Sequence, residues 1–260
     1  MPRVSVIMSV YNGSKFLDQS IESILKQTFP DFEFLIVDDC STDSSLKIIA
    51  KYAKQDSRIR IIKNETNIGL TKSLNRAILE SKGEYIARID ADDFSYPERF
   101  KKQVKFLDSN LKCGLVGAWA EIIDDNDKVM RAIKYPTLSV DLKRDLIKYN
   151  PFFHSSIMIR RSTLDQVGLY NEEFRYAQDY ELYFRIASKY GLENIPNVLI
   201  KYRESSSSIT GKKNKKQIGF VIKAKLNAIK QGWHPRWCYI FLIRNYVSWL
   251  LPAKVKRLFK

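Results

Sequence analysis

Short apolar runs alternate with helix-spaced apolar positions along the first 110 residues of the chain. Four runs are typical of strands buried on both faces, namely 4–10, 32–37, 59–62 and 85–89. Between them, apolar residues recur at helical spacing in three segments, which contain 17–25, 46–53 and 70–78. This alternation predicts an α/β fold with a mostly parallel sheet, flanked by helices and joined by right-handed crossovers.

The pattern is less regular after residue 110. Further strands are predicted at 115–123, 156–159 and 198–202, and a helix at 180–187. A polar, basic linker over 205–216 leads into two expected helices, at about 217–231 and 236–250. We therefore expect one α/β domain over 1–205, with a regular half of about 1–110 and a less regular half of about 111–205. A basic amphipathic helical tail would occupy 206–260.

The charge is concentrated in this tail. The chain of 260 residues has 44 Lys and Arg against 29 Asp and Glu, a net charge of +15. From residue 205 onward there are 13 basic residues and no acidic one, so nearly all the excess lies there. Three widely separated cysteines make a disulfide framework or zinc site improbable and favour a reducing compartment. Without a signal segment or an apolar run of membrane-spanning length, we expect a cytoplasmic protein.

Polar clusters follow three of the predicted strands. They are Tyr11-Asn12-Gly13, Asp38-Asp39 and the segment from Asp90 to Asp93. Ligands of parallel sheets bind at the carboxyl ends of strands, so these clusters should converge on one crevice. Three close carboxylates at 90, 92 and 93 repel one another and favour a hard cation such as Mg²⁺ or Mn²⁺. The alternatives are a solvated acidic turn for the last cluster and helix capping for Asp38 and Asp39.

Two further side chains are candidates for chemistry. Asp179 lies at the start of a predicted helix and could be a general base or an N-cap. His154 could bind phosphate or metal, or could be a structural hydrogen-bonding residue. The sequence contains no G-x-G-x-x-G and no G-x-x-x-x-G-K-[ST], which disfavours a dinucleotide-dependent dehydrogenase and a P-loop NTPase.

Taken in order, these motifs resemble those of the inverting family-2 glycosyltransferases, which have a GT-A (Rossmann-like) fold and build bacterial surface polysaccharides. The resemblance covers about 3–205 and rests on six segments: 4–12, 36–43, 67–70, 87–93, 154–156 and 178–182. Each segment is weak evidence alone, but six in the expected order are a strong signal. One departure is Gln178, where many relatives have Glu.

The resemblance implies that 1–205 is a catalytic domain, with a nucleotide-binding half of about 1–110 and an acceptor half of about 111–205. It also implies a role for individual residues. Tyr11 and Asp39 would contact the nucleotide base, Asp90 would lie near the ribose, and Asp92 would bind the metal, Mn²⁺ or Mg²⁺. Asp179 would be the catalytic base. His154 would lie near acceptor or phosphate, and Asp93 receives no role. The implied reaction is a single displacement that moves a sugar from a nucleotide-diphosphate sugar, with UDP favoured as carrier, to a glycan or lipid-linked saccharide.

Aromatic residues accompany the basic residues of the tail. This combination suits an anionic membrane surface, so we expect peripheral attachment at the inner face of the plasma membrane. The alternative is two ordinary packing helices with a solvated basic face.

Two other functions compete with glycosyl transfer. A nucleotidyltransferase that makes nucleotide sugars would also use a metal and an α/β sheet, but the segment 12–15 is a poor match for its glycine-rich loop. A nucleic-acid-binding protein would fit a pI near 9.6. It would leave the acidic strand ends unexplained, so no nucleic-acid partner is expected. The sequence patterns do not identify the donor sugar, the acceptor or the oligomeric state.

Overall fold

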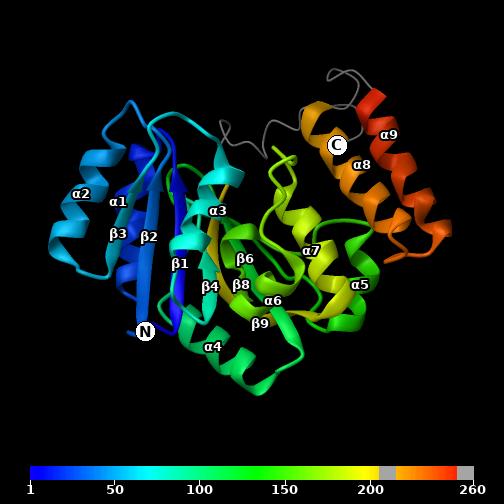
Figure 1. Ribbon diagram of the computed structural model, residues 1–260, viewed down its shortest axis with the longest axis horizontal. Helices are drawn as coiled ribbons and strands as arrows, with labels where there is room; N and C mark the ends of the chain where they lie inside the picture. Colours follow the sequence, from blue (N-terminus) through cyan, green and yellow to red (C-terminus); the bar gives the residue numbers. More distant parts are fainter. Residues whose placement is uncertain (205–214, 251–260) are drawn as a thin grey trace.

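A computed structural model describes residues 1–204 and 215–250 of the chain, and Figure 1 shows helices packed around a central sheet. The strands of the sheet are β1 (Val4–Val10), β2 (Phe32–Asp38), β3 (Ile59–Lys63), β4 (Tyr85–Arg88), β5 (Phe94–Ser95), β6 (Cys113–Ile123), β7 (Val129–Ile133), β8 (Met158–Arg160) and β9 (Gly191–Arg203). Their spatial order is β3-β2-β1-β4-β8-β6-β9-β5, with β7 beside β6.

The α-helices begin and end at the following residues: α1 (Ser14–Leu25), α2 (Ser45–Gln55), α3 (Leu70–Glu80), α4 (Arg99–Ser109), α5 (Ser139–Leu146), α6 (Arg161–Val167), α7 (Gln178–Lys189), α8 (Lys215–Lys230) and α9 (Ile240–Leu250). Two short 3₁₀ turns, η1 (His154–Ser156) and η2 (Arg236–Tyr239), complete the described elements.

Alternating side chains of β1 explain why the N-terminal half of the sheet is buried on both faces. Val6 and Met8 pack in the cluster that contains α1, α2 and α4, whereas Ile7 packs in the cluster that contains α3 and α7. The strands β3, β2, β1 and β4 are all parallel, so their carboxyl ends lie at one edge. The predicted α/β fold with a parallel N-terminal half is confirmed.

The acidic segment after β4 crosses this edge. β8 lies antiparallel between β4 and β6, and β9 runs parallel to β6. The chain leaves β4 in the middle of the sheet and enters β5, where Phe94 pairs with Lys201 of β9 at the far end. The turn from Asp90 to Asp93 therefore joins two distant parts of the sheet.

The tail helices α8 and α9 pack together beside α7 (Figure 1). A buried lysine joins them to the rest of the molecule, because Lys225 Nζ donates to the Lys148 carbonyl at 3.0 Å and to Asn245 Oδ1 at 2.8 Å. Burial lowers the pKa of Lys225 to about 8. Of the linker expected over 205–216, residues 205–214 lie outside the described residues, whereas Lys215 and Lys216 begin α8. Within those described, no helix is long and apolar enough to cross a bilayer.

Candidate active site

Asp90 is paired with a buried arginine. The Arg88 guanidinium, only 2% exposed, donates to both carboxylate oxygens of Asp90. Ser155 Oγ accepts the Asp90 backbone N–H at 3.1 Å and a hydrogen bond from Arg88 at 2.9 Å. Desolvating a guanidinium is costly unless it is paired, so this strand-end arginine fixes the orientation of the Asp90 carboxylate.

Asp92 and Asp93 complete the acidic turn. One carboxylate oxygen from each of Asp90, Asp92 and Asp93 lies within 4.8 Å of the others. Burial, followed by the charge of Asp90, raises the pKa of Asp92 to about 6. Burial, followed by the charge of Asp92, raises the pKa of Asp93 well above its usual range. Crowding of this kind disfavours three anions and would be relieved by a cation.

The hydrogen bonds of the turn distinguish the three carboxylates. Asp93 Oδ1 accepts the Arg203 backbone N–H at 2.8 Å, and its buried Oδ2 has no partner among residues 1–204 and 215–250. No described side chain donates a hydrogen bond to the Asp92 carboxylate, whereas Asp90 is already engaged by Arg88. The carboxylate oxygens of the turn are therefore ligands of the kind that hard divalent cations bind, and neither the Asp92 carboxylate nor Asp93 Oδ2 accepts a hydrogen bond from a described side chain.

Arg203 stabilises the acidic turn through a backbone contact. Its side chain is fully buried, and Nε donates to the Asp92 carbonyl at 2.9 Å. Its Nη1 donates to the Asp124 carbonyl at 2.7 Å, and Nη2 pairs with Asp127 at 2.6 Å. One arginine at the end of β9 thus joins the acidic turn to the hairpin between β6 and β7. Neither Arg88 nor Arg203 was identified from the sequence, although an arginine within an apolar strand signals a buried partner.

Tyr11 and Asp39 lie together at the ends of β1 and β2, since the Asp39 backbone N–H donates to the Val10 carbonyl at 2.8 Å. Tyr11 is 53% exposed and Asp39 only 2%. Both Asp39 oxygens are occupied: Oδ1 accepts from Asn64 Nδ2 at 2.7 Å and from the Ile68 N–H at 2.9 Å, and Oδ2 accepts from the Gly69 N–H at 2.8 Å. Asp39 therefore fixes the loop that precedes α3.

Asp179 lies in the first turn of α7. The helix begins after Ala177, whose left-handed φ of 55° turns the chain into it, and no side chain caps this end. Asp179 Oδ2 accepts a hydrogen bond from Asn150 Nδ2 at 2.9 Å. Burial raises the pKa of Asp179, and the Tyr180 backbone N–H and Arg88 partly oppose this effect. A carboxylate with a raised pKa is suited to accept a proton.

His154 is paired with a tyrosine. Its Nε2 lies 2.8 Å from Tyr170 Oη, and the two rings meet edge to face. Burial, with a smaller contribution from Arg88, lowers the pKa of His154 well below its usual value, so the ring is neutral at neutral pH. Burial raises the pKa of Tyr170, and the charges of Asp179 and Asp90 add to this effect, so Tyr170 lies near both carboxylates.

Comparison with known proteins identifies the family of this chain. Residues 5–168 match the family "Glycosyl transferase family 2". The chain is 32% identical over 260 residues to the amylovoran biosynthesis glycosyltransferase AmsE of Erwinia amylovora, covering 96% of this chain and 95% of AmsE. It is 32% identical over 212 residues to the O-antigen biosynthesis glycosyltransferase WbnJ of Escherichia coli, covering 79% of this chain and 81% of WbnJ.

Solved structures share the fold. S. aureus TarS 1-349 in complex with UDP matches with a TM-score of 0.70 at 23% identity, over 88% of this chain and 65% of that one. The mannosyltransferase PcManGT of Pyrobaculum calidifontis, in complex with GDP-Man and Mn²⁺, matches with a TM-score of 0.69 at 18% identity, over 99% of this chain and 78% of that one. The fold is thus that of the GT-A glycosyltransferases, and the chain belongs to glycosyl transferase family 2.

Proposed function

We propose that this glycosyltransferase moves a sugar from a nucleotide-diphosphate sugar to a hydroxyl of a glycan or lipid-linked saccharide, with inversion at the anomeric carbon. The observation that carries the proposal is that Arg88, which is paired with Asp90 of the acidic turn, also acts on the carboxylate of Asp179 at the start of α7. Tyr170 lies near both carboxylates. UDP is the favoured carrier, and TarS has been solved with UDP-GlcNAc. AmsE and WbnJ, which are named for surface-polysaccharide biosynthesis, support a saccharide acceptor.

The residues at the strand ends would bind the donor. Exposed Tyr11 offers an aromatic face to the base, beside the loop that Asp39 fixes. Asp90, oriented by Arg88, would accept hydrogen bonds from the ribose hydroxyls. Asp92 would hold Mn²⁺ or Mg²⁺, which would neutralise the charge that develops on the leaving diphosphate. PcManGT, whose structure contains Mn²⁺, supports this assignment.

The other side of the crevice would bind the acceptor. Asp179 would remove the acceptor proton as the acceptor oxygen attacks the anomeric carbon from the face opposite the diphosphate. Its raised pKa strengthens it as a base. His154 and Tyr170 would line the acceptor side as a neutral hydrogen-bonded pair.

A donor-hydrolysis screen across UDP-, GDP- and dTDP-sugars with Mn²⁺ or Mg²⁺ tests the donor and metal assignments together. We expect one nucleotide sugar to be hydrolysed in the presence of metal and not in EDTA. Asp92→Asn should lower this rate by about 100-fold or more, because several kcal/mol of charge stabilisation would be lost. Asp125→Asn, which changes an exposed carboxylate paired with Lys15, is the matched control and should leave the rate unchanged. Full activity in EDTA would exclude the metal assignment.

We also propose that the tail over 206–260 attaches the protein peripherally to the cytoplasmic face of the plasma membrane. Exposed apolar side chains follow one another at helical spacing along η2 and α9: Trp237, Ile240, Ile243, Val247 and Leu250. This set, the α9 stripe, lies in a segment without acidic residues. An apolar helix face within a basic segment suits an anionic lipid surface.

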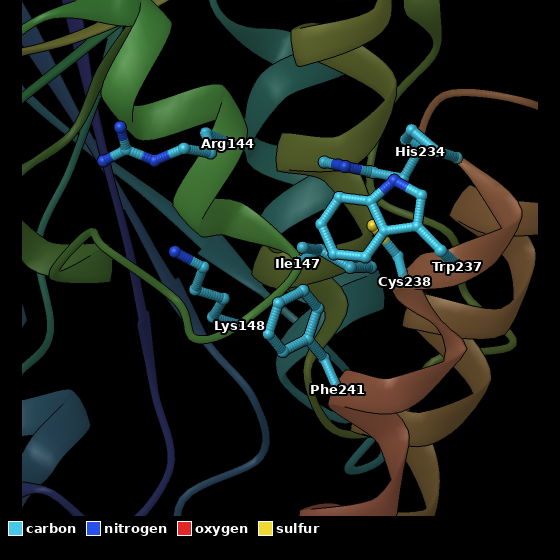
Figure 2. Close-up of a pocket in the computed structure, with 8 residues that line it drawn as sticks. Arg144, Ile147, Lys148, His234, Trp237, Cys238 and Phe241 are labelled. Carbon is cyan, nitrogen blue, oxygen red and sulfur yellow. The ribbon is translucent and has the colours of Figure 1, made fainter.

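A pocket adjoins the α9 stripe. It measures about 390 Å³ and lies between the end of α5 and the start of α9. Figure 2 shows Trp237 and Phe241 on one side and the cationic Arg144 and Lys148 on the other. None of the residues that line it belongs to the acidic turn, so the pocket supports a role in surface attachment rather than in donor binding.

A further inference from the structure

Asn150 is the described side chain that contacts the carboxylate of Asp179. Its Nδ2 donates to Asp179 Oδ2 at 2.9 Å. Its Oδ1 accepts the Phe152 backbone N–H at 3.2 Å. An amide oxygen cannot donate and an amide nitrogen cannot accept, so this second bond determines which end of the Asn150 amide faces Asp179.

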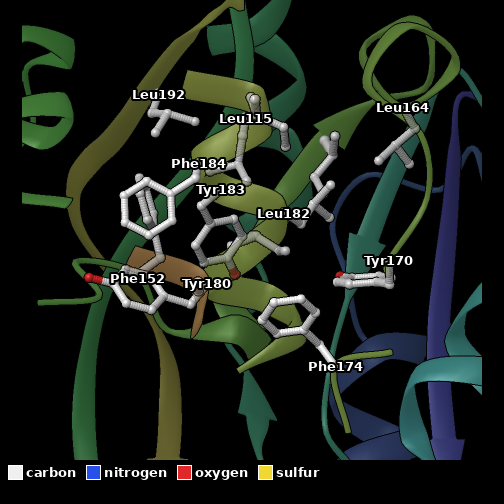
Figure 3. Packing of buried hydrophobic residues seen from close by; sticks show 14 of the residues in the cluster. Leu115, Phe152, Leu164, Tyr170, Phe174, Tyr180, Leu182, Tyr183, Phe184 and Leu192 are labelled. Atoms are coloured by element: carbon white, nitrogen blue, oxygen red, sulfur yellow. The ribbon is translucent and has the colours of Figure 1, made fainter. Parts of the chain in front are cut away.

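The segment that carries Asn150 is attached to its surroundings on three sides. Tyr180 Oη of α7 donates to the Leu146 carbonyl, and Lys225 Nζ of α8 donates to the Lys148 carbonyl at 3.0 Å. Phe152 packs edge to face against Tyr183, one turn after Asp179 on α7, with ring centroids 5.2 Å apart. Figure 3 shows Phe152, Tyr180 and Tyr183 within one buried cluster. Asn150 is therefore held rigidly against α7.

This geometry restricts where a proton can go. Since Asn150 Nδ2 only donates, Asp179 Oδ2 accepts its hydrogen bond whether the carboxyl group is ionised or protonated. A carbonyl oxygen is a better acceptor than the oxygen of a carboxylic O–H, so this bond favours placing the transferred proton on Oδ1. The bond also fixes the rotation of the carboxylate about its Cβ–Cγ bond. Both effects are of the kind that positions a general base before reaction.

We propose that Asn150 is a positioning residue for the base, presenting Asp179 Oδ1 to the acceptor hydroxyl and stabilising the ionised carboxylate. The proposal rests on the proposed role of Asp179. Asn150 acts through Asp179 rather than on the reacting atoms. It lies between two uncharged residues, Tyr149 and Pro151, and sequence patterns did not single it out.

Two substitutions test the proposal by donor hydrolysis, using UDP-N-acetylglucosamine or GDP-mannose, whichever the wild-type protein hydrolyses. Asn150→Asp keeps the acceptor to the Phe152 N–H but replaces the donor to Asp179 by an anionic oxygen. Asn150→Ala removes both bonds without adding charge. Both should lower kcat by about 10- to 100-fold with KM for the donor within about threefold, because carboxylate orientation is lost while donor binding is not.

The pH profile separates positioning from a merely structural role. A hydrogen bond to the charged form lowers a carboxyl pKa, so its loss raises the pKa of Asp179. Because the base must be ionised, the acid limb of the kcat profile should move upward by about one pH unit in Asn150→Ala and further in Asn150→Asp. Tyr149→Phe, which removes the hydroxyl that donates to Asp145 Oδ2 at 3.4 Å and leaves the Asn150–Asp179 bond, should leave the limb in place and serves as the control.

The outcomes are distinct from those that bear on the reaction itself. An inactive Asp179→Asn variant together with Asn150 variants of wild-type kcat and pH profile would refute the positioning role alone. A fully active Asp179→Asn variant would refute both the base and its positioning residue. If Asn150→Asp behaved like wild type while Asn150→Ala did not, the asparagine would only support the Phe152 turn. Melting temperatures of all variants guard against misfolding.

Discussion

At the scale of single residues, Asp39 combines a structural contact with a proposed binding role. Its carboxylate accepts three N–H groups and is 2% exposed. Buried carboxylates with this many donors are costly to alter, because each donor left unpaired loses the free energy of a charge-assisted hydrogen bond. Asp39 therefore stabilises the loop before α3, whatever contact it makes with the donor.

We expect Asp39→Asn to lower the free energy of unfolding by about 2–4 kcal/mol, because the introduced NH₂ group must face one of these donors. Urea denaturation would measure the change, and Asp125→Asn is the matched surface control. A variant with unchanged stability but much weaker binding of UDP would instead assign Asp39 chiefly to the nucleotide base.

At the scale of elements, the strands and helices of the first 110 residues could be predicted because their apolar periodicity is undisturbed. The helix predicted around 17–25 ends at Leu25, because Gln27 and Thr28 bind the backbone around Pro97 instead of continuing the helix. β9 was predicted over only five residues, since Asn194, Pro196 and Asn197 break the apolar pattern of a strand that has 13.

The site was predictable only in part for a related reason. Carboxylates at strand ends are visible as a local cluster, so Asp90 and Asp92 could be found. Two other residues of the site are close to their partners only in space: Arg203 meets the turn across 110 residues of sequence, and Asn150 meets Asp179 across 29. Contacts between residues so far apart in sequence cannot be predicted from local sequence patterns.

Two glycines test how tightly the elements pack. A Cβ at Gly83, just before β4, would lie 2.5 Å from the Ser5 backbone nitrogen of β1. We expect Gly83→Ala to lower the free energy of unfolding by about 1–3 kcal/mol, because backbone cannot yield as a flexible side chain can. In contrast, Gly219→Ala in α8 meets only Trp249 Nε1 at 3.9 Å. It should raise that free energy by about 0.5–1 kcal/mol through helix propensity. Urea denaturation measures both changes. If the two substitutions changed the free energy of unfolding equally, this description of the packing would be wrong.

At the scale of the whole molecule, the proposed membrane attachment separates surface binding from chemistry. The wild-type protein should float with phosphatidylglycerol vesicles at low salt, and salt should weaken binding as it screens the basic tail. The double substitution Ile243→Asp and Val247→Asp should abolish flotation without lowering the melting temperature, because both side chains are about half exposed.

A matched substitution elsewhere controls for surface charge. Leu79 of α3 is 74% exposed and lies outside the tail, so Leu79→Asp should leave flotation unchanged. Donor hydrolysis without an acceptor should be the same in all these variants. If the wild-type protein did not float, the membrane attachment would be refuted, and α8 and α9 would only pack against the rest of the molecule.

The turn that joins β4 to the far end of the sheet also affects how the protein acquires its site during folding. Asp93 closes against the Arg203 backbone 110 residues later, so a growing chain carries its acidic segment through most of synthesis before that partner exists. Closure of so long a loop is slow compared with local helix formation. We therefore expect the acidic turn to take its final geometry late, once β9 is in place, so that a partly folded chain does not yet present the complete turn to a nucleotide sugar.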